Sequence, residues 1–261
     1  MNKISVGISP CPNDTFVFGA LVKGYVDTKD YKLDFQLLDV EKLNELSQKD
    51  VFDVVKISVA NYKLIKDKYF LLSSGAALGK GVGPIAVSKN KIDLKEIPYK
   101  RIGIPGRFTT AAFLFNYFFK PKGEIHEYPY NRIIDAILKE EIDIGILIHE
   151  TRFVYQSYGL VKIADLGTMW EEHTSLPVPL GIIVSKKSLG EDFSSWMENK
   201  IRESLKFAYS NKEKIWDFIK ENAQEMDDKT INSHIETFVN SYTYDLKEEG
   251  KRAILRLIQE V

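Results

Sequence analysis

Apolar and polar positions follow two different periods along the first three-quarters of the chain. Short runs that are apolar throughout, or at every second position, predict β-strands, whereas apolar residues three or four apart predict helices. We expect strands at residues 4–8, 32–38, 53–57, 69–73, 85–89, 101–104, 124–128, 143–148, 160–166 and 182–186. We expect helices at residues 15–22, 41–48, 59–66, 109–119 and 131–139, with another beginning near residue 150. This alternation favours βα units, an α/β fold and a largely parallel sheet.

Only the helical period continues after about residue 190. Trp, Phe, Ile and Leu recur there at helical spacing, which predicts helices at residues 193–209, 212–221, 229–239 and 246–259. Their apolar residues are most simply core contacts, and we assign no chemistry to this part of the chain.

Two similar segments, residues 85–89 (IAVSK) and 182–186 (IIVSK), each follow a stretch rich in Gly or Pro. They predict two crossover strands that join two lobes, with lobe 1 formed by residues 1–84 and 181–261 and lobe 2 by residues 85–180. A ligand would then bind in the cleft between the lobes, and a few backbone positions would absorb closure. The alternative is two ordinary strands that are similar by chance.

Composition narrows the classes of protein. The chain has 261 residues, enough for one large or two modest domains. Its 36 Lys and Arg are scattered among 37 Asp and Glu, so we expect no nucleic-acid partner. One cysteine, Cys11, excludes an intramolecular disulfide and a multi-cysteine zinc site. No apolar run has the length of a signal peptide or a membrane span, so we expect a cytoplasmic protein without a membrane partner.

Small polar residues follow several of the predicted strands, where open α/β sheets bind their ligands and helix N-termini offer unpaired N–H groups. After the first strand, Asn13, Asp14 or Thr15 either caps the next helix or faces the ligand. Cys11 could be a nucleophile, but no residue near it in sequence would lower its pKa, which favours a structural role.

Two further strand ends carry candidate binding residues. Lys56 closes an otherwise apolar strand, so its side chain either reaches solvent or points into the cleft, and Ser58 would cap the next helix. After a Pro-Gly turn, Thr109 and Thr110 precede another helix, and capping needs only one of them. The second threonine suits a small anion, and Arg107 is either a surface residue or a carboxylate partner.

His149 directly follows a buried apolar strand. Histidine exchanges protons near neutral pH, so His149 is a candidate general base, and Glu150 either caps the next helix or assists it. The alternative is a histidine merely hydrogen-bonded at a strand end. Dinucleotide-binding, P-loop and HExxH patterns are absent, and no metal or flavin site is predicted.

These junctions together resemble the 1,4-dihydroxy-6-naphthoate synthases of the futalosine route to menaquinone. The similar segments are SPCPNDTFVFGAL, DVVKIS, SGAALGKGVGP, IPGRFTTA, GILIHETR and DLGTMWEEHTSLPVPLG, in order from residue 9 to about residue 181. The helical tail is similar only in character. Met169 departs from the pattern, which more often has another aromatic residue beside Trp170.

The resemblance implies a type II periplasmic-binding-protein fold used as a cytoplasmic enzyme. It implies cleavage of cyclic dehypoxanthinyl futalosine to 1,4-dihydroxy-6-naphthoate and dihydroxyacetone, without a metal or other cofactor. The proton acceptor of the family falls here on His149. Its substrate-binding segments fall on Lys56, Ile57, Ser58, Thr109 and Thr110. The place of Arg107 in that pattern stays open.

Two other functions remain open at this point. One is a chorismate dehydratase of the same pathway, and the other is a non-catalytic protein of the same fold that binds a small acid. The sequence also leaves both a monomer and a homodimer open.

Overall fold

The chain forms two compact units in the computed structural model, which describes residues 2–29, 31–223 and 227–261. Unit 1 comprises Met1–Leu78 and Pro179–Val261, and unit 2 comprises Gly79–Val178. The chain therefore leaves unit 1, builds unit 2 and returns. The boundaries expected from the two similar strands, after residues 84 and 180, fall six and two residues later than these.

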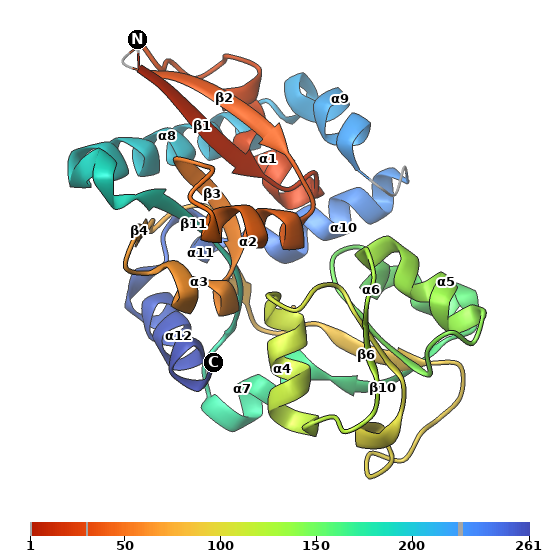
Figure 1. The fold of residues 1–261 in the computed structure, drawn as a ribbon. Coiled ribbons are helices and arrows are strands. Elements are labelled where there is room, and N and C mark those ends of the chain that lie inside the picture. The colour runs from red at the N-terminus through yellow and green to blue at the C-terminus, as the bar shows by residue number, and fades with distance from the viewer. Residues whose placement is uncertain (1, 30, 224–226) are drawn as a thin grey trace. The chain divides into compact units, whose positions relative to one another are not determined.

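Unit 1 contains a mixed sheet with the strand order β2-β1-β3-β11-β4, and β5 also pairs with β11. The strands are β1 (Asn2–Ile8), β2 (Tyr31–Leu37), β3 (Val54–Ser58), β4 (Tyr69–Leu71), β5 (Ala77–Gly79) and β11 (Val178–Lys186). β1, β2 and β3 are parallel, whereas β11 runs antiparallel to both β3 and β4 (Figure 1). Along this strand order β2, β1, β3 and β4 therefore share one direction and only the returning strand β11 is reversed, so the sheet is largely parallel as expected.

Helices cover both faces of this sheet. They are α1 (Pro12–Val22), α2 (Val40–Gln48), α3 (Val59–Ile65), α8 (Gly190–Ser210), α9 (Lys212–Asn222), α10 (Asp228–Phe238), α11 (Ser241–Tyr244) and α12 (Lys247–Glu260). Val6 and Ile8 of β1 share a core with apolar residues of α1, α8, α9 and α10. Gly7 points to the opposite face, where a Cβ atom would lie 2.9 Å from Leu43 of α2. The helical tail thus has the packing role that its spacing predicts.

Unit 2 contains a second mixed sheet with the strand order β10-β6-β9-β7-β8. Its strands are β6 (Ile85–Ser88), β7 (Ile102–Ile104), β8 (Ile125–Glu127), β9 (Ile144–Leu147) and β10 (Val161–Asp165). Its helices are α4 (Thr110–Phe119), α5 (Ile133–Leu138), α6 (Thr151–Val154) and α7 (Leu166–Thr174). β7, β8 and β9 are parallel, and β6 is antiparallel to β9 and β10. Gly145 of β9 lets α5 approach, since a Cβ atom there would lie 2.4 Å from Ile133.

Helix α7 was not expected from the sequence. Gly167 stands in its first turn, and glycine weakens a helix prediction. The structure explains this glycine, because a Cβ atom on Gly167 would lie only 2.5 Å from the Cα atom of Gly83. The Asp165 carboxylate caps the helix by accepting the N–H of Thr168 at 3.1 Å. A close contact between two backbone segments therefore requires the residue that obscured the helix.

Candidate functional site

The predicted residues lie at or just after the carboxyl ends of strands in each unit, and neighbouring parallel strands end at a common sheet edge. In unit 1, the loop after β1 and the end of β3 lie at that edge, which places Asp14 beside Lys56. In unit 2, the ends of β7 and β9 share an edge, so the segment with Thr109 and Thr110 and the segment with His149 follow neighbouring strands. This is where open α/β sheets hold their ligands.

Lys56 and Asp14 form a buried ion pair in unit 1. The Lys56 Nζ atom donates to Asp14 Oδ1 at 2.6 Å and to the Gly75 carbonyl oxygen at 3.1 Å. Only 6% and 2% of the two side chains are exposed, so Lys56 does not reach solvent. Gly181 makes room for it, because a Cβ atom there would lie 2.8 Å from Lys56 Cε. Buried charges need such partners, since an unpaired one is strongly destabilising.

Asp14 is also held by the turn that precedes it. Its Oδ2 atom accepts the Ser9 hydroxyl at 2.7 Å and the Ser9 N–H at 3.3 Å. The N-cap residue of α1 is Cys11, whose side chain makes no capping hydrogen bond. Asn13, Asp14 and Thr15 lie inside the first turn, so the expectation that one of them is the N-cap residue is wrong. Asp14 instead fixes the Lys56 ammonium group at the sheet edge.

The same network continues into the C-terminal helices. The Asn13 Nδ2 atom donates to Asp14 Oδ1 at 2.9 Å, and its Oδ1 atom lies 3.0 Å from His234 Nε2. His234 is fully buried on the face of α10 that also carries Ile231 and Ile235. Sequence reasoning gave His234 no role. The signal that could have found it is a polar residue on the apolar face of a helix.

Ser58 makes a contact different from the one expected. It occupies the N-cap position of α3, but its side chain makes no capping hydrogen bond. Its hydroxyl accepts Asn44 Nδ2 at 3.1 Å, and its N–H donates to Asn44 Oδ1 at 2.9 Å. Asn44 of α2 was not predicted, and it positions Ser58 from a neighbouring helix. The Ile57 side chain is fully buried.

One of the two threonines of unit 2 caps a helix, as the sequence predicts. Thr109 is the N-cap residue of α4, with its Oγ1 atom accepting the Ala112 N–H at 3.1 Å and donating to the Gly106 carbonyl at 2.7 Å. Thr110 is buried in the first helical turn. Arg107 is a surface residue whose Nε atom donates to Glu127 Oε1 at 2.8 Å. This hydrogen bond lowers the pKa of Glu127, so the carboxylate partner of Arg107 in this structure belongs to the protein itself.

His149 has a left-handed backbone conformation, with φ of 53°. This conformation is uncommon for residues other than glycine and costs on the order of 1–2 kcal/mol, so such a residue at a strand end supports a functional hypothesis. The imidazole ring meets the ring of Tyr130 edge-on, with centroids 4.9 Å apart. The Tyr130 hydroxyl donates to Glu150 Oε1 at 3.0 Å. Glu150 occupies the N-cap position of α6, but its side chain makes no capping hydrogen bond there.

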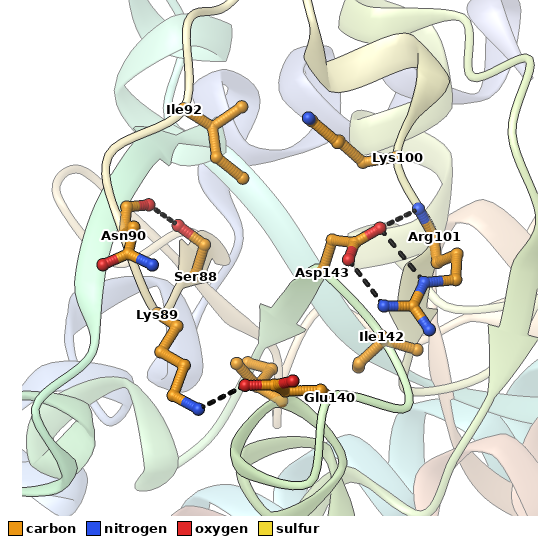
Figure 2. A pocket seen from close by; sticks show the side chains of 10 residues that line it. Ser88, Lys89, Asn90, Ile92, Lys100, Arg101, Glu140, Ile142 and Asp143 are labelled. Atoms are coloured by element: carbon orange, nitrogen blue, oxygen red, sulfur yellow. Dashed lines mark hydrogen bonds and ion pairs between the residues drawn. The ribbon is translucent and has the colours of Figure 1, made fainter.

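A pocket in unit 2 lies away from these residues (Figure 2). Its volume is about 240 Å³, and it is bordered by Ser88 at the end of β6 and by residues just before β7 and β9, which is the opposite edge of the sheet. Four of its charged side chains form two ion pairs: Arg101 lies 2.7 Å from Asp143, and Lys89 lies 2.8 Å from Glu140 (Figure 2). None of the predicted site residues lines this pocket.

The described residues contain neither a metal-binding cluster nor a membrane-crossing helix. Within ranges 2–29, 31–223 and 227–261, no group of three or more His, Cys, Asp or Glu side chains could hold a metal ion. No helix in the same ranges combines the length and the apolar character needed to cross a membrane.

Solved structures define the class of fold. A ligand-binding component of an ABC-type import system from Staphylococcus aureus has a TM-score of 0.71 and 13% identity, over 100% of this chain and 92% of that one. A Candida albicans protein described as having the generic periplasmic binding protein fold has a TM-score of 0.65 and 12% identity, over 100% and 95%. The chain therefore has a periplasmic-binding-protein fold.

The chain belongs to the menaquinone biosynthesis family, whose model matches residues 4–261. Two relatives are named 1,4-dihydroxy-6-naphtoate synthase. The one from Thermus thermophilus is 40% identical over 100% of this chain and 94% of its own, and the one from Streptomyces coelicolor is 37% identical over 98% and 91%. A crystal structure of an Archaeoglobus fulgidus protein is 35% identical with a TM-score of 0.93, over 99% and 96%. These findings confirm the family resemblance read from the sequence.

Proposed function

We propose that this protein is a carbon–carbon lyase of menaquinone biosynthesis that converts cyclic dehypoxanthinyl futalosine to 1,4-dihydroxy-6-naphthoate and dihydroxyacetone. The full-length similarity to two relatives with that synthase name supports the reaction. The observation that carries the assignment of the base is His149, held in a left-handed conformation at the carboxyl edge of the unit 2 sheet. A strained histidine at such an edge fits a reaction that begins with removal of a proton.

In this proposal, a neutral His149 takes a proton from the sugar-derived part of the substrate. Loss of that proton starts the cleavage of the carbon–carbon bond, and formation of the aromatic naphthoate drives it forward. One positioned base typically contributes about 10²–10⁴-fold to the rate. The edge-on contact with Tyr130 limits rotation of the imidazole ring, and Glu150 orients Tyr130 through its hydroxyl.

The substrate carries an aromatic carboxylate, and the proposal assigns anionic oxygens to Lys56, Ser58 and the threonines that begin α4. Among the described residues, Lys56 uses two of its three N–H donors, on Asp14 and on the Gly75 carbonyl. The third can serve an anion. Asp14 carries the wrong charge for direct contact with a carboxylate, so we assign it the role of holding Lys56. Thr110 supplies a hydroxyl at the start of a helix, where the dipole favours negative charge.

Substitution of His149 by alanine tests the base. The variant is expected to fold, to keep a KM close to that of the unaltered protein and to lose about 10²–10⁴-fold in kcat, because only proton transfer is removed. Turnover is measured by chromatographic separation of the products. His173→Ala is the matched control, because His173 lies on α7 against Tyr117 and has no assigned role. If His149→Ala retains most of its activity, His149 is not the base.

The substrate itself is tested in the same assay. The protein is incubated separately with cyclic dehypoxanthinyl futalosine and with chorismate, and the products of each are separated. Formation of the naphthoate and dihydroxyacetone from the first supports the proposal. Turnover of chorismate alone would make the protein a dehydratase, and turnover of neither would favour a binding protein.

A further inference from the structure

The hydrogen bonds of unit 1 determine which way the Asn13 amide faces. A carboxylate oxygen only accepts hydrogen bonds, so the Asn13 atom that lies 2.9 Å from Asp14 Oδ1 must be the NH₂ group. The amide oxygen therefore faces His234 Nε2 at 3.0 Å, and an amide oxygen also only accepts. It follows that the Nε2 atom of His234 carries a hydrogen and donates it to Asn13.

This donor begins an ordered chain of contacts that ends at Lys56. His234 donates to Asn13, Asn13 donates to Asp14 Oδ1, and Lys56 donates to the same Oδ1 atom at 2.6 Å. The four residues are 0%, 6%, 1% and 5% exposed in that order. In such a low-dielectric setting, each group keeps the orientation that satisfies its neighbour. These hydrogen bonds thus connect α10 to β3 through α1.

We propose that His234 is a positioning residue that sets the direction of the Lys56 ammonium group. Without a donor at Nε2, the Asn13 amide is no longer fixed, and Asp14 Oδ1 loses its second donor. The carboxylate then shifts toward Lys56, and the third N–H of Lys56 turns away from the anionic oxygen that it would bind. This inference rests on the proposed role of Lys56 in holding the acidic substrate.

A purely structural role for His234 is the competing explanation, because α10 packs on α1 through the same side chain. The two explanations differ in what a donor at one point in space should restore. Anchoring of α10 depends on the shape of the fully buried imidazole and on how it fills the space between α10 and α1. Positioning depends on an N–H group at the place of Nε2.

A matched pair of substitutions separates the explanations. The amide nitrogen of glutamine in His234→Gln can occupy the place of Nε2, whereas His234→Asn is one carbon shorter and cannot. We expect His234→Asn to raise KM by about tenfold, the loss of one charge-assisted hydrogen bond, with kcat nearly unchanged. His234→Gln should restore KM. Equal KM values in the unaltered protein and both variants, with only thermal stability reduced, would overturn the inference.

A second readout does not depend on turnover. Lysine labelled with ¹³C at Cε gives one NMR signal per residue, and the signal of Lys56 is the one absent from Lys56→Met. It should shift in His234→Asn and stay in place in His234→Gln. Asn13→Ala breaks the same chain from α1 and should shift the signal as well, so it replaces His234→Asn if that variant does not fold. A signal that stays in place when the chain is broken overturns the inference.

The two proposals fail in distinguishable ways. Absence of turnover in the unaltered protein removes the proposed reaction, and the NMR signal then decides the positioning role by itself. If turnover depends on His149 but KM is the same in the unaltered protein and in both His234 variants, the proposed reaction stands and the positioning role of His234 is removed.

Discussion

Asp53 joins three segments of unit 1. Its Oδ2 atom accepts the N–H and the hydroxyl of Ser5 at 2.9 and 2.8 Å, and its Oδ1 atom accepts Lys186 Nζ at 3.1 Å. Burial alone raises the pKa of Asp53, but the hydrogen bonds from Ser5 and Lys186 together lower it below the ordinary value of 3.8. The ionised carboxylate therefore contributes to the stability of the folded state.

The pH dependence of unfolding should show this contribution. Because the folded-state pKa is lowered, the contribution is complete above the ordinary value of 3.8 and is lost as the pH falls through the folded-state value. The difference in unfolding free energy between the unaltered protein and Asp53→Asn should therefore be largest near neutral pH and shrink below pH 3.8. Urea titrations at several pH values measure it. Exposed Asp67→Asn is the control, and a difference for Asp53→Asn that does not change with pH would contradict the prediction.

At the residue scale, the sequence identified polar residues in unusual positions but not the residues that they contact. Lys56 and His149 stood out because each breaks an apolar run at the end of a strand. The partner of Lys56 lies 42 residues away, and His234 lies 221 residues from Asn13. Such pairs depend on which helix packs against which strand. Local patterns contain no information about that.

At the scale of elements, periodicity located the strands but not their neighbours or directions. β6 was predicted at its observed place and β11 four residues short at its start, and β6 is antiparallel to β9 and β10 as β11 is to β3 and β4. The pattern of side chains along a strand is the same in both directions. Helix α7 was not predicted because Gly167 has a low helix propensity. The glycine is needed for a close contact with Gly83, and local propensity contains no information about such a distant contact.

The contact between these two glycines can be tested by adding one methyl group. Gly83→Ala should lower the free energy of unfolding by about 3 kcal/mol, the upper end for overpacking, because the obstructing atoms belong to the backbone. Gly81→Ala is the control in the same segment. A Cβ atom at Gly81 meets nothing within 4 Å, so only its φ of 69° opposes the change, at about 1 kcal/mol. Equal losses in chemical unfolding would show that the contact is not tight.

At the scale of the whole molecule, the two units have separate apolar cores. Ile219 belongs to the core of unit 1, and Ile133 belongs to the core of unit 2. The two similar segments in the sequence indicated a discontinuous chain path, but not the point of division, which lies in the glycine-rich stretch before β6. Two separate cores should give the units separate local stabilities.

Hydrogen exchange with mass spectrometry tests this independence. Ile133→Ala should remove about 2–5 kcal/mol from its core and weaken amide protection mainly within residues 79–178. Ile219→Ala is the matched substitution, with its effect mainly in the remaining residues. Both side chains are fully buried, so the two changes are comparable. A uniform loss of protection along the chain in either variant would show that the units unfold together.

The place of β11 between β3 and β4 also has a consequence during synthesis on the ribosome. β3 and β4 leave the exit tunnel before any residue of unit 2, but the strand that joins them follows only at the end of that unit. At about 5–20 residues per second, unit 2 takes roughly 5–20 s to translate. During that time the first sheet has a gap with unpaired strand edges, which are prone to aggregate. Unit 2 is therefore complete on the nascent chain before the sheet of unit 1 is. A chaperone that binds exposed strands would act in this interval.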